Sequence, residues 1–142
     1  MRRTLLICYL ALSCSPTPPA PAQVPTHQWF GHEVTASAYN SVHWQTDTLD
    51  PSVAAWGDTL RPGMKSIAVS RDLIKMGLTH NTMVKIDTFP DTFLVKDKMH
   101  RRWKNRIDIY MGNNVKKARD WGRKKLMICY ALPLDTLLTN IQ

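Results

Sequence analysis

The alternation of apolar and polar residues along the chain predicts a small domain built mostly of short strands. The segments "VTASAYNS" and "TMVKIDTF" alternate, and "RIDIYMG" places Ile107 and Ile109 on one face with Asp108 and Tyr110 on the other. Because successive side chains of a strand point to opposite faces, each segment is expected to bury one side. The segments "SIAVS", "TFLVKDK" and "KLMICYAL" add three further strands, which makes about six in all.

Two short segments carry helix signals. The segment "RDLIKMG" follows Ser70, a preferred N-cap residue, and stops at Gly77. In "NNVKKARDWGRKK" an apolar residue recurs at every third position, and Gly122 ends the pattern. A long polar connection, "NSVHWQTDTLDPSVAAWGDTLRPGM", joins the first two strands, and loops of this length commonly carry function. Six strands with one or two short helices predict a mainly β fold, a small barrel rather than a sandwich.

The N-terminal segment has the features of a secretory signal. In "MRRTLLICYLALSC" two arginines precede an apolar run, which is shorter than the about 20 residues that a permanent membrane span needs. Two exits remain open: lipidation of Cys14 after "ALS", or cleavage after Ala22 in "APA". The predicted organisation is a signal peptide and the start of a proline-rich tether in 1–22, a linker in 23–33, the folded domain in 34–132 and a tail in 133–142.

Export changes the interpretation of the charge. The chain of 142 residues has a formal net charge of +8, and much of it lies late, in "KDKMHRRWKNR" and "KKARDWGRKK". Such a surplus in a cytosolic protein would indicate nucleic acid first. Outside the cytoplasm the anionic partners are cell-wall polymers and membrane lipids, unless the charge serves solubility alone.

The cysteines and histidines favour neither a disulfide nor a metal site. Once a signal peptide is removed, Cys129 remains alone inside the apolar segment "KLMICYAL", where we expect a small core residue. The histidines lack the spacing of metal ligands. They are His27, His32, His43, His80 and His100. No cofactor and no metal are therefore expected.

The segment "VKDKMHRRWKNRIDIYMG" places two carboxylates at the ends of the most basic part of the chain. Asp97 and Asp108 are eleven positions apart, with six basic or histidine side chains between them. Strand alternation places Asp97 on the face of Val95 and directs its flanking lysines away. A carboxylic acid needs a raised pKa to donate a proton near neutrality, and neighbouring cations would lower it. The simpler alternatives are a solvated Asp97 and an Asp108 that caps a turn or bridges to Arg106.

Tryptophans in loop-like segments could provide sugar-stacking platforms. Trp44, Trp56 and Trp103 lie outside the predicted strands and helices, whereas Trp121 belongs to the apolar stripe of a helix and is expected in the core. For each of the first three, ordinary packing is the alternative to ligand stacking.

Four segments together resemble a known family. "VTASAYN", "AAWGDTLRPGMKSIAVSRDLI", "VKD" and "RIDIYMGNNVKKARDWGRKK" resemble, in order, segments of the 3D (three-aspartate) domain, over about residues 34–130. That domain is similar to the core of membrane-bound lytic transglycosylase A and to the domain of rare lipoprotein A, so the resemblance implies a six-stranded double-psi β-barrel. Two positions depart from the family pattern. Ser70 stands where the first aspartate is usual, and Lys98-Met99-His100 replace a Thr-Gly-Gly turn.

The resemblance also implies a function and a set of site residues. It implies cleavage of the MurNAc–GlcNAc bonds of peptidoglycan in cell-wall turnover, with Asp97 as the acid/base and Asp108 as a second catalytic carboxylate. The substrate contacts would come from Tyr39, Trp56, Arg101, Arg102 and Trp103. The expected partner is the peptidoglycan glycan strand, and the membrane is expected only through a lipid anchor at Cys14.

The remaining expectations concern location, assembly and competing functions. The protein is expected to be an exported monomer in the periplasm or at the outer membrane, with no nucleic acid partner. A non-catalytic peptidoglycan-binding module is the main alternative, favoured by the two departures from the family pattern. Binding of acidic lipids or nucleic acid through Trp and Arg is a third interpretation, which predicts a strong dependence on salt.

Overall fold

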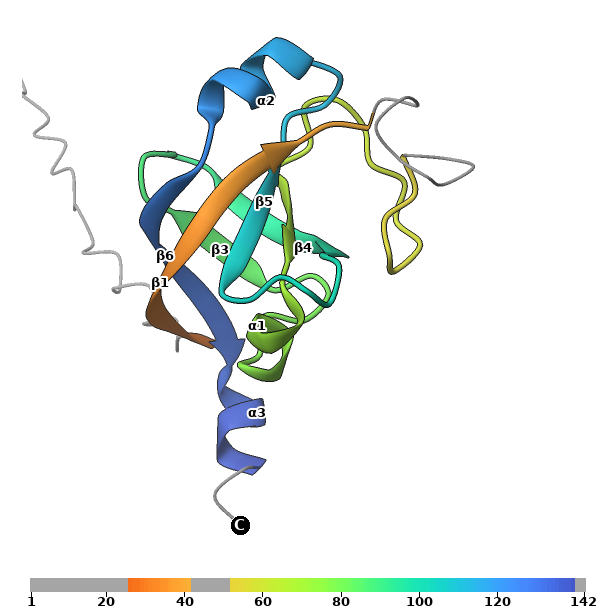
Figure 1. The fold of residues 1–142 in the computed structure, drawn as a ribbon. Coiled ribbons are helices and arrows are strands. Elements are labelled where there is room, and N and C mark those ends of the chain that lie inside the picture. Colours follow the sequence, from red (N-terminus) through yellow and green to blue (C-terminus); the bar gives the residue numbers. More distant parts are fainter. Residues whose placement is uncertain (1–25, 42–51, 140–142) are drawn as a thin grey trace, which may run out of the picture.

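The computed structural model of the protein describes residues 26–41 and 52–139. The elements, in chain order, are β1 (His27–Tyr39), β2 (Ser66–Val69), α1 (Arg71–Lys75), β3 (Met83–Ile86), β4 (Thr92–Lys98), β5 (Arg106–Tyr110), α2 (Val115–Trp121), β6 (Lys124–Pro133) and α3 (Leu134–Thr139). The six strands close into a barrel in the order β1-β5-β2-β4-β3-β6 (Figure 1). The predicted mainly β six-stranded barrel is confirmed, and the topology is compatible with a double-psi barrel. Among the residues described, no helix has the length and apolar character that crossing a membrane requires.

The barrel is a mixed sheet with a continuous apolar interior. β1 pairs with β5 and β2 with β4 in parallel, whereas the other neighbouring strands run antiparallel. Ile67 on β2 pairs with Val95 on β4 and with Ile109 on β5, and each side chain is at most 1% exposed. Residues paired across strands share a face of the sheet, so this row marks the inside of the barrel.

A β-bulge in β4 changes which face its acidic residue occupies. Ile67 pairs with Val95, but the next residue of β2, Ala68, pairs with Asp97, so that Lys96 is the extra residue. An extra residue interrupts the alternation of side chains. Asp97 therefore shares the outer face with Ala68 and lies opposite the inward-pointing Val95. The prediction that Asp97 shares the face of Val95 is wrong for this reason.

The folded domain begins earlier and ends later in the chain than the residue pattern predicted. β1 begins at His27, so most of the predicted linker 23–33 is strand, and Phe30 within it stacks on Tyr130 with ring centroids 5.8 Å apart. The predicted tail contains α3, which Figure 1 shows at the same end of the barrel as α1, with α2 at the other end.

Cys129 is exposed, and the prediction of a small core residue is wrong. Its strand neighbours Ile128 and Tyr130 are buried, at 0% and 6% exposed. Because the strand alternates, the residue between two inward-pointing side chains must point outward. The nearly continuous apolar run in the sequence concealed this alternation.

Candidate functional site

The two carboxylates predicted from the sequence lie in one row across the outer face of the barrel. Asp97 on β4 pairs with Ala68 on β2, Ala68 pairs with Asp108 on β5, and Asp108 pairs with Ser37 on β1. Neighbouring strands are about 4.8 Å apart, so the Cα atoms of the two aspartates are separated by two such spacings, roughly 10 Å. We call Ser37, Asp108, Ala68 and Asp97 the carboxylate row.

Asp97 is held by two backbone amides that bind the same oxygen. The N–H of Ala55 donates to Oδ1 at 2.7 Å and the N–H of Lys98 donates to Oδ1 at 2.8 Å, so Oδ2 takes neither bond. Burial raises the pKa of the Asp97 carboxyl, and the charge of Asp108 adds to the increase, while these amides and the charge of Lys98 oppose it. The balance is a raised pKa, which favours a proton on this carboxyl.

The segment 52–60 covers Asp97 and is attached to the barrel at several points. Ala54 and Leu60 pack with Tyr110 in a second hydrophobic cluster outside the barrel. A bridge between Val53 and Thr59 closes the segment into a loop. We call residues 52–60 the cover loop, because its Ala55 amide lies directly on the Asp97 carboxylate.

Asp58 ties the cover loop to β4 and to the segment before β3. Its Oδ1 accepts a hydrogen bond from Nζ of Lys96 at 2.8 Å, and its Oδ2 lies 2.5 Å from Nε2 of His80. The hydrogen bond from Lys96, and then that from His80, lower the pKa of Asp58 despite some burial. The bulge therefore has two consequences: Asp97 moves to the outer face, and Lys96 becomes available to hold the cover loop.

Trp56 lies on the cover loop, directly after Ala55, whose amide binds Asp97. Its ring stacks on His80 with centroids 5.4 Å apart, and Nζ of Lys98 lies 4.7 Å from the centre of its ring. Trp56 is half-buried. The structure therefore places Trp56 in the same region as Asp97.

The other end of the row is organised by a buried arginine. The hydroxyl of Ser37 donates to Oδ1 of Asp108, and Nη2 of Arg106 donates to the Ser37 oxygen at 2.7 Å. Arg106 is 8% exposed, and its Cζ lies 4.0 Å from the centre of the Trp103 ring. Its Nε is buried without a partner among the residues described. Ser37 thus links a fixed positive charge to Asp108.

Tyr39 lies at the end of β1 beside both carboxylates. Burial, and then the charges of Asp97 and Asp108, raise the pKa of its hydroxyl well above the ordinary value. That hydroxyl is buried and has no hydrogen-bond partner within residues 26–41 and 52–139. Tyr39 therefore stays protonated and can donate a hydrogen bond to a group that enters the row.

The two positions that depart from the family pattern have structural roles here. Ser70 is 0% exposed and occupies the N-cap position of α1, but its side chain does not cap the helix. Its Oγ instead accepts the backbone N–H of Arg106 at 3.0 Å. Met99 is 6% exposed, and its N–H donates to the carbonyl of Val69 at 2.9 Å. Ser70 therefore ties the end of β2 to β5, and Met99 ties the end of β4 to β2.

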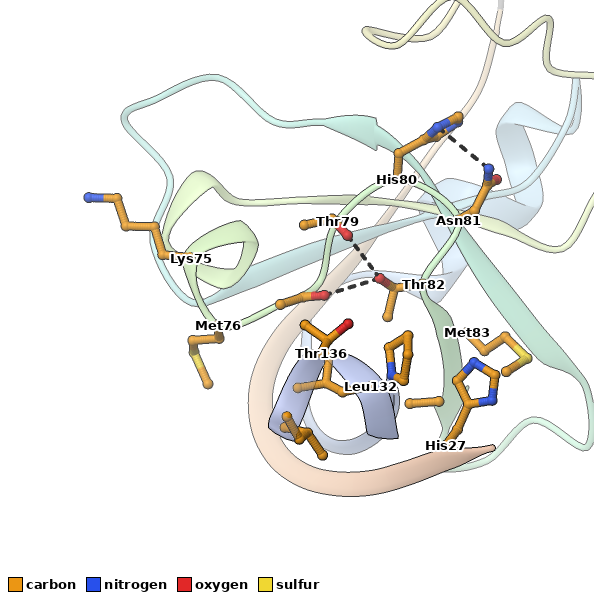
Figure 2. Close-up of a pocket in the computed structure, with 14 residues that line it drawn as sticks. His27, Lys75, Met76, Thr79, His80, Asn81, Thr82, Met83, Leu132 and Thr136 are labelled. Carbon is orange, nitrogen blue, oxygen red and sulfur yellow. Dashed lines mark hydrogen bonds between the residues drawn. The ribbon is translucent and has the colours of Figure 1, made fainter. Parts of the chain in front are cut away.

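A cavity of about 380 Å³ lies away from the row, between α3, the end of β6 and the segment from α1 to β3. Figure 2 shows Thr82 bonded to Thr79 and to the carbonyl of Gly77, at 3.4 and 3.1 Å. His80 lies at its edge (Figure 2) and thereby connects it to Asp58. Within residues 26–41 and 52–139, no aspartate or glutamate lines this cavity. It can accept hydrogen-bonding groups but lacks the acid that the row provides.

The predicted site residues are only partly brought together. Tyr39, Trp56, Asp97 and Asp108 share one region, and Trp103 joins it through Arg106. Arg102 contacts the Trp103 ring at 4.7 Å but is exposed, and Arg101 is exposed on the same turn. Cys14, Trp44 and the predicted signal lie outside the described residues.

Sequence reasoning missed the residues that hold the carboxylates in place. Ser37 could have been found, because it lies two residues from Tyr39 on the same strand face. Arg106 was expected only as a direct partner of Asp108, whereas in the structure it reaches Asp108 through the Ser37 hydroxyl. Asp58, Lys96 and His80 carry no such signal, since they meet only through the bulge and the cover loop. No group of three or more potential metal ligands occurs in the part of the chain that the structure describes.

No protein-family model matches the chain, and no curated protein matches it either.

Proposed function

We propose that this protein is an exported cell-envelope enzyme of the 3D-domain type that cleaves the glycan strands of peptidoglycan. The bond concerned is the glycosidic bond between MurNAc and GlcNAc. Asp97 is the general acid and base, and Asp108 orients the substrate and supports the raised pKa of Asp97. The substrate lies along the outer face of β4, β2, β5 and β1, beside the cover loop.

The observation that carries this proposal is the raised pKa of the Asp97 carboxyl together with the hydrogen bonds that it accepts. A general acid must hold a proton near neutrality and must present it to the leaving oxygen. Burial raises the pKa of Asp97, and both backbone donors bind Oδ1, so Oδ2 is the oxygen available to carry a proton in the proposed reaction. The aspartate is therefore neither an ordinary solvated carboxylate nor a fully saturated structural one.

The proposed reaction uses one carboxyl group in two steps. Protonated Oδ2 of Asp97 gives its proton to the glycosidic oxygen as the bond to C1 of MurNAc breaks. The resulting carboxylate then accepts the proton of the C6 hydroxyl, whose oxygen bonds to C1 and closes a 1,6-anhydro ring. Water takes no part, and Asp97 ends the cycle protonated. In this proposal the buried Tyr39 hydroxyl, which is protonated and has no partner among the described residues, donates a hydrogen bond to the sugar.

Aromatic and basic side chains around the row suit the rest of this substrate. Trp56 offers its ring to the apolar face of a pyranose, which would take the place of His80 or of Lys98, the two side chains that lie over the ring. Arg101 and Arg102, exposed on the turn after β4, suit the lactyl and peptide carboxylates of the strand.

A second function, peptidoglycan binding without cleavage, is favoured by one observation. Ser70 and Met99, which replace an aspartate and a glycine of the family pattern, are both buried. A glycine-rich turn would allow a sugar to approach the backbone, whereas Met99 fills that place. In this case the row would recognise the strand through Tyr39, Asp97 and Asp108.

The test is digestion of isolated peptidoglycan sacculi by purified residues 23–142. Wild type is compared with Asp97→Asn and with Asp87→Asn, a matched control at an exposed aspartate outside the row. Mass spectrometry of the soluble products should show anhydro-muropeptides from wild type and from the control. Asp97→Asn should lower their rate of release about 10²- to 10⁴-fold, the usual contribution of a general acid.

Other products would change the proposal in specific ways. Reducing-end muropeptides would retain the enzyme and replace the lytic step by hydrolysis. An absence of products from every variant, with all of them pelleting on sacculi, would assign the protein to the binding class.

A further inference from the structure

Two arginines at the β1 end of the carboxylate row have no acid as a direct partner. Nη2 of Arg106 donates to the hydroxyl of Ser37, whereas its Nε is buried without an acceptor among the residues that the structure describes. Among the ion pairs of residues 26–41 and 52–139, none includes Arg106 or Arg123. A buried charged donor without an acceptor is unfavourable, so a ligand that supplies an acceptor there gains affinity.

The strand register places Arg123 beside the same serine. Lys124 pairs with Ala36 on β1, and the two strands run antiparallel, so Arg123, one residue earlier, lies beside Ser37, one residue later. Burial, and then the charge of Arg123, lower the pKa of the Arg106 guanidinium, while the charge of Asp108 opposes this. Two like charges from distant parts of the chain therefore act on one another at this end of the row.

The two arginines differ in how they are held. Cζ of Arg106 lies 4.0 Å from the centre of the Trp103 ring, and the Arg106 side chain is only 8% exposed. A guanidinium packed on a ring and bonded at one end has already lost most of its freedom, so binding an anion costs it little further entropy. Arg123 is exposed, and its guanidinium can turn toward an anion that enters from solvent.

The charge and the donor geometry at this end suit a carboxylate. Asp108, the acid that acts on Arg106, accepts the hydroxyl of Ser37 and neutralises one of the two arginine charges. The net charge around Ser37 is therefore positive, and Arg102 over the Trp103 ring adds to it. A guanidinium matches the planar carboxylate group with two parallel hydrogen bonds.

We propose that Arg106 and Arg123 form a subsite for the lactyl carboxylate of a MurNAc residue. This inference rests on the proposed function, because it assigns one group of that substrate to two further side chains. It also predicts that strands bearing this sugar acid are preferred to uncharged chains of GlcNAc. The exposed Arg101 and Arg102 then remain for the carboxylates of the peptide.

The position of the subsite fixes which sugar it holds. Asp97 and Ser37 lie at opposite ends of the carboxylate row, three strand spacings apart, which is roughly 14 Å along the sheet. That length exceeds a single sugar ring. The carboxylate therefore belongs to a MurNAc further along the strand than the one whose bond Asp97 breaks, and short fragments that lack it bind more weakly.

The test is NMR titration of purified residues 23–142, which contain all six strands, with two single sugars. N-acetylmuramic acid carries the lactyl carboxylate, and N-acetylglucosamine is the same ring without it. We expect N-acetylmuramic acid to shift the amide signals of Ser37, Arg106 and Arg123. It should bind about tenfold more tightly than N-acetylglucosamine, the size of effect that a hydrogen bond between charged groups provides.

The main variant is Arg123→Gln, because Arg123 is exposed and its replacement leaves the barrel intact. It should weaken binding of N-acetylmuramic acid about tenfold and leave binding of N-acetylglucosamine unchanged. Lys85→Gln is the matched control, since it removes the same charge from an exposed position of β3, which pairs with neither β1 nor β5. This control should bind both sugars as wild type does.

Four results would overturn the subsite. They are no binding of N-acetylmuramic acid, equal affinity for the two sugars, an equal loss in Arg123→Gln and Lys85→Gln, and tighter binding of N-acetylglucosamine 6-phosphate, which would assign the arginines to a phosphate. Digestion of sacculi tests the proposed function separately. Intact sacculi together with the expected sugar binding would refute the cleavage and support the subsite, whereas digestion with equal sugar affinities would do the reverse.

Discussion

Replacement of Ala55 by proline isolates the hydrogen bond that opposes protonation of Asp97. The N–H of Ala55 donates to Oδ1 of Asp97 at 2.7 Å, and proline has no N–H. The backbone tolerates the change, because the N–H of Gly57 bonds to the carbonyl of Ala54 and places Ala55 second in a turn. Proline is favoured at that turn position. The substitution therefore removes one donor and keeps the cover loop.

The size of the effect follows from the charge of the acceptor. A hydrogen bond to an ionised group contributes about 1.5–3 kcal/mol, and it favours the charged form. Since one pKa unit corresponds to about 1.4 kcal/mol, Ala55→Pro should raise the pKa of Asp97 by about one to two units above its already raised value. Ala55→Gly keeps the N–H and is the matched control.

The effect on folding has a defined sign. A carboxyl whose pKa is higher in the folded state than in the unfolded chain stabilises the fold at low pH. That contribution is lost as the pH rises from the unfolded value of about 3.9 through the folded pKa. In Ala55→Pro the loss should be larger and should extend to higher pH than in wild type.

The assay is a carbon-13 NMR titration of the Asp97 carboxyl, with Asp97→Asn to assign the resonance. Urea unfolding across the same pH range measures the stability difference. An unchanged or lowered pKa in Ala55→Pro, with Ala55→Gly equal to wild type, would show that the Ala55 amide does not stabilise the Asp97 carboxylate.

Three further predictions concern the cover loop, the barrel interior and a turn. Asp58→Asn removes a carboxylate whose pKa is lowered by its hydrogen bond from Lys96. Wild type should therefore lose the stability that Asp58 provides as the pH falls below about 3.9, whereas the variant should lack it at every pH; urea unfolding above and below that pH tests this. Ile109→Ala, at a side chain 1% exposed, should lower the unfolding free energy by about 2–5 kcal/mol, against less than about 0.5 for the exposed control Val53→Ala, in denaturant titrations. Gly77→Ala should cost about 1–3 kcal/mol in the same assay, because Gly77 has φ +104° and a Cβ there would lie 2.6 Å from Leu132; stability equal to wild type would contradict it.

The fold class could be predicted from the sequence because local periodicity carries it. Ile107 and Ile109 alternate with Asp108, and the structure buries the first two and leaves the third on the outer face. The strand ends were harder to predict. The segment before Val34 has little regular alternation, yet β1 begins at His27, because β6 pairs with it over ten positions.

The site could be predicted only as far as strand alternation held. Asp108 lies where alternation places it. Asp97 lies on the opposite face from the predicted one, because Lys96 bulges, and no local pattern in "FLVKDK" signals an extra residue. The prediction for Cys129 was wrong for a related reason: an apolar run does not show which of its members face solvent.

The residue pattern alone thus predicted a β-barrel of six short strands and identified Asp97 and Asp108 as candidate site residues. The tertiary structure decided which face those acids occupy and what surrounds them. Asp97 acquires its raised pKa from burial beside a loop whose Ala55 is 42 positions away in the chain, and the loop is held by Asp58, Lys96 and His80. The physical reason is that alternation is a local property of the backbone, whereas bulges, burial and ion pairs depend on strand register and on contacts between distant segments.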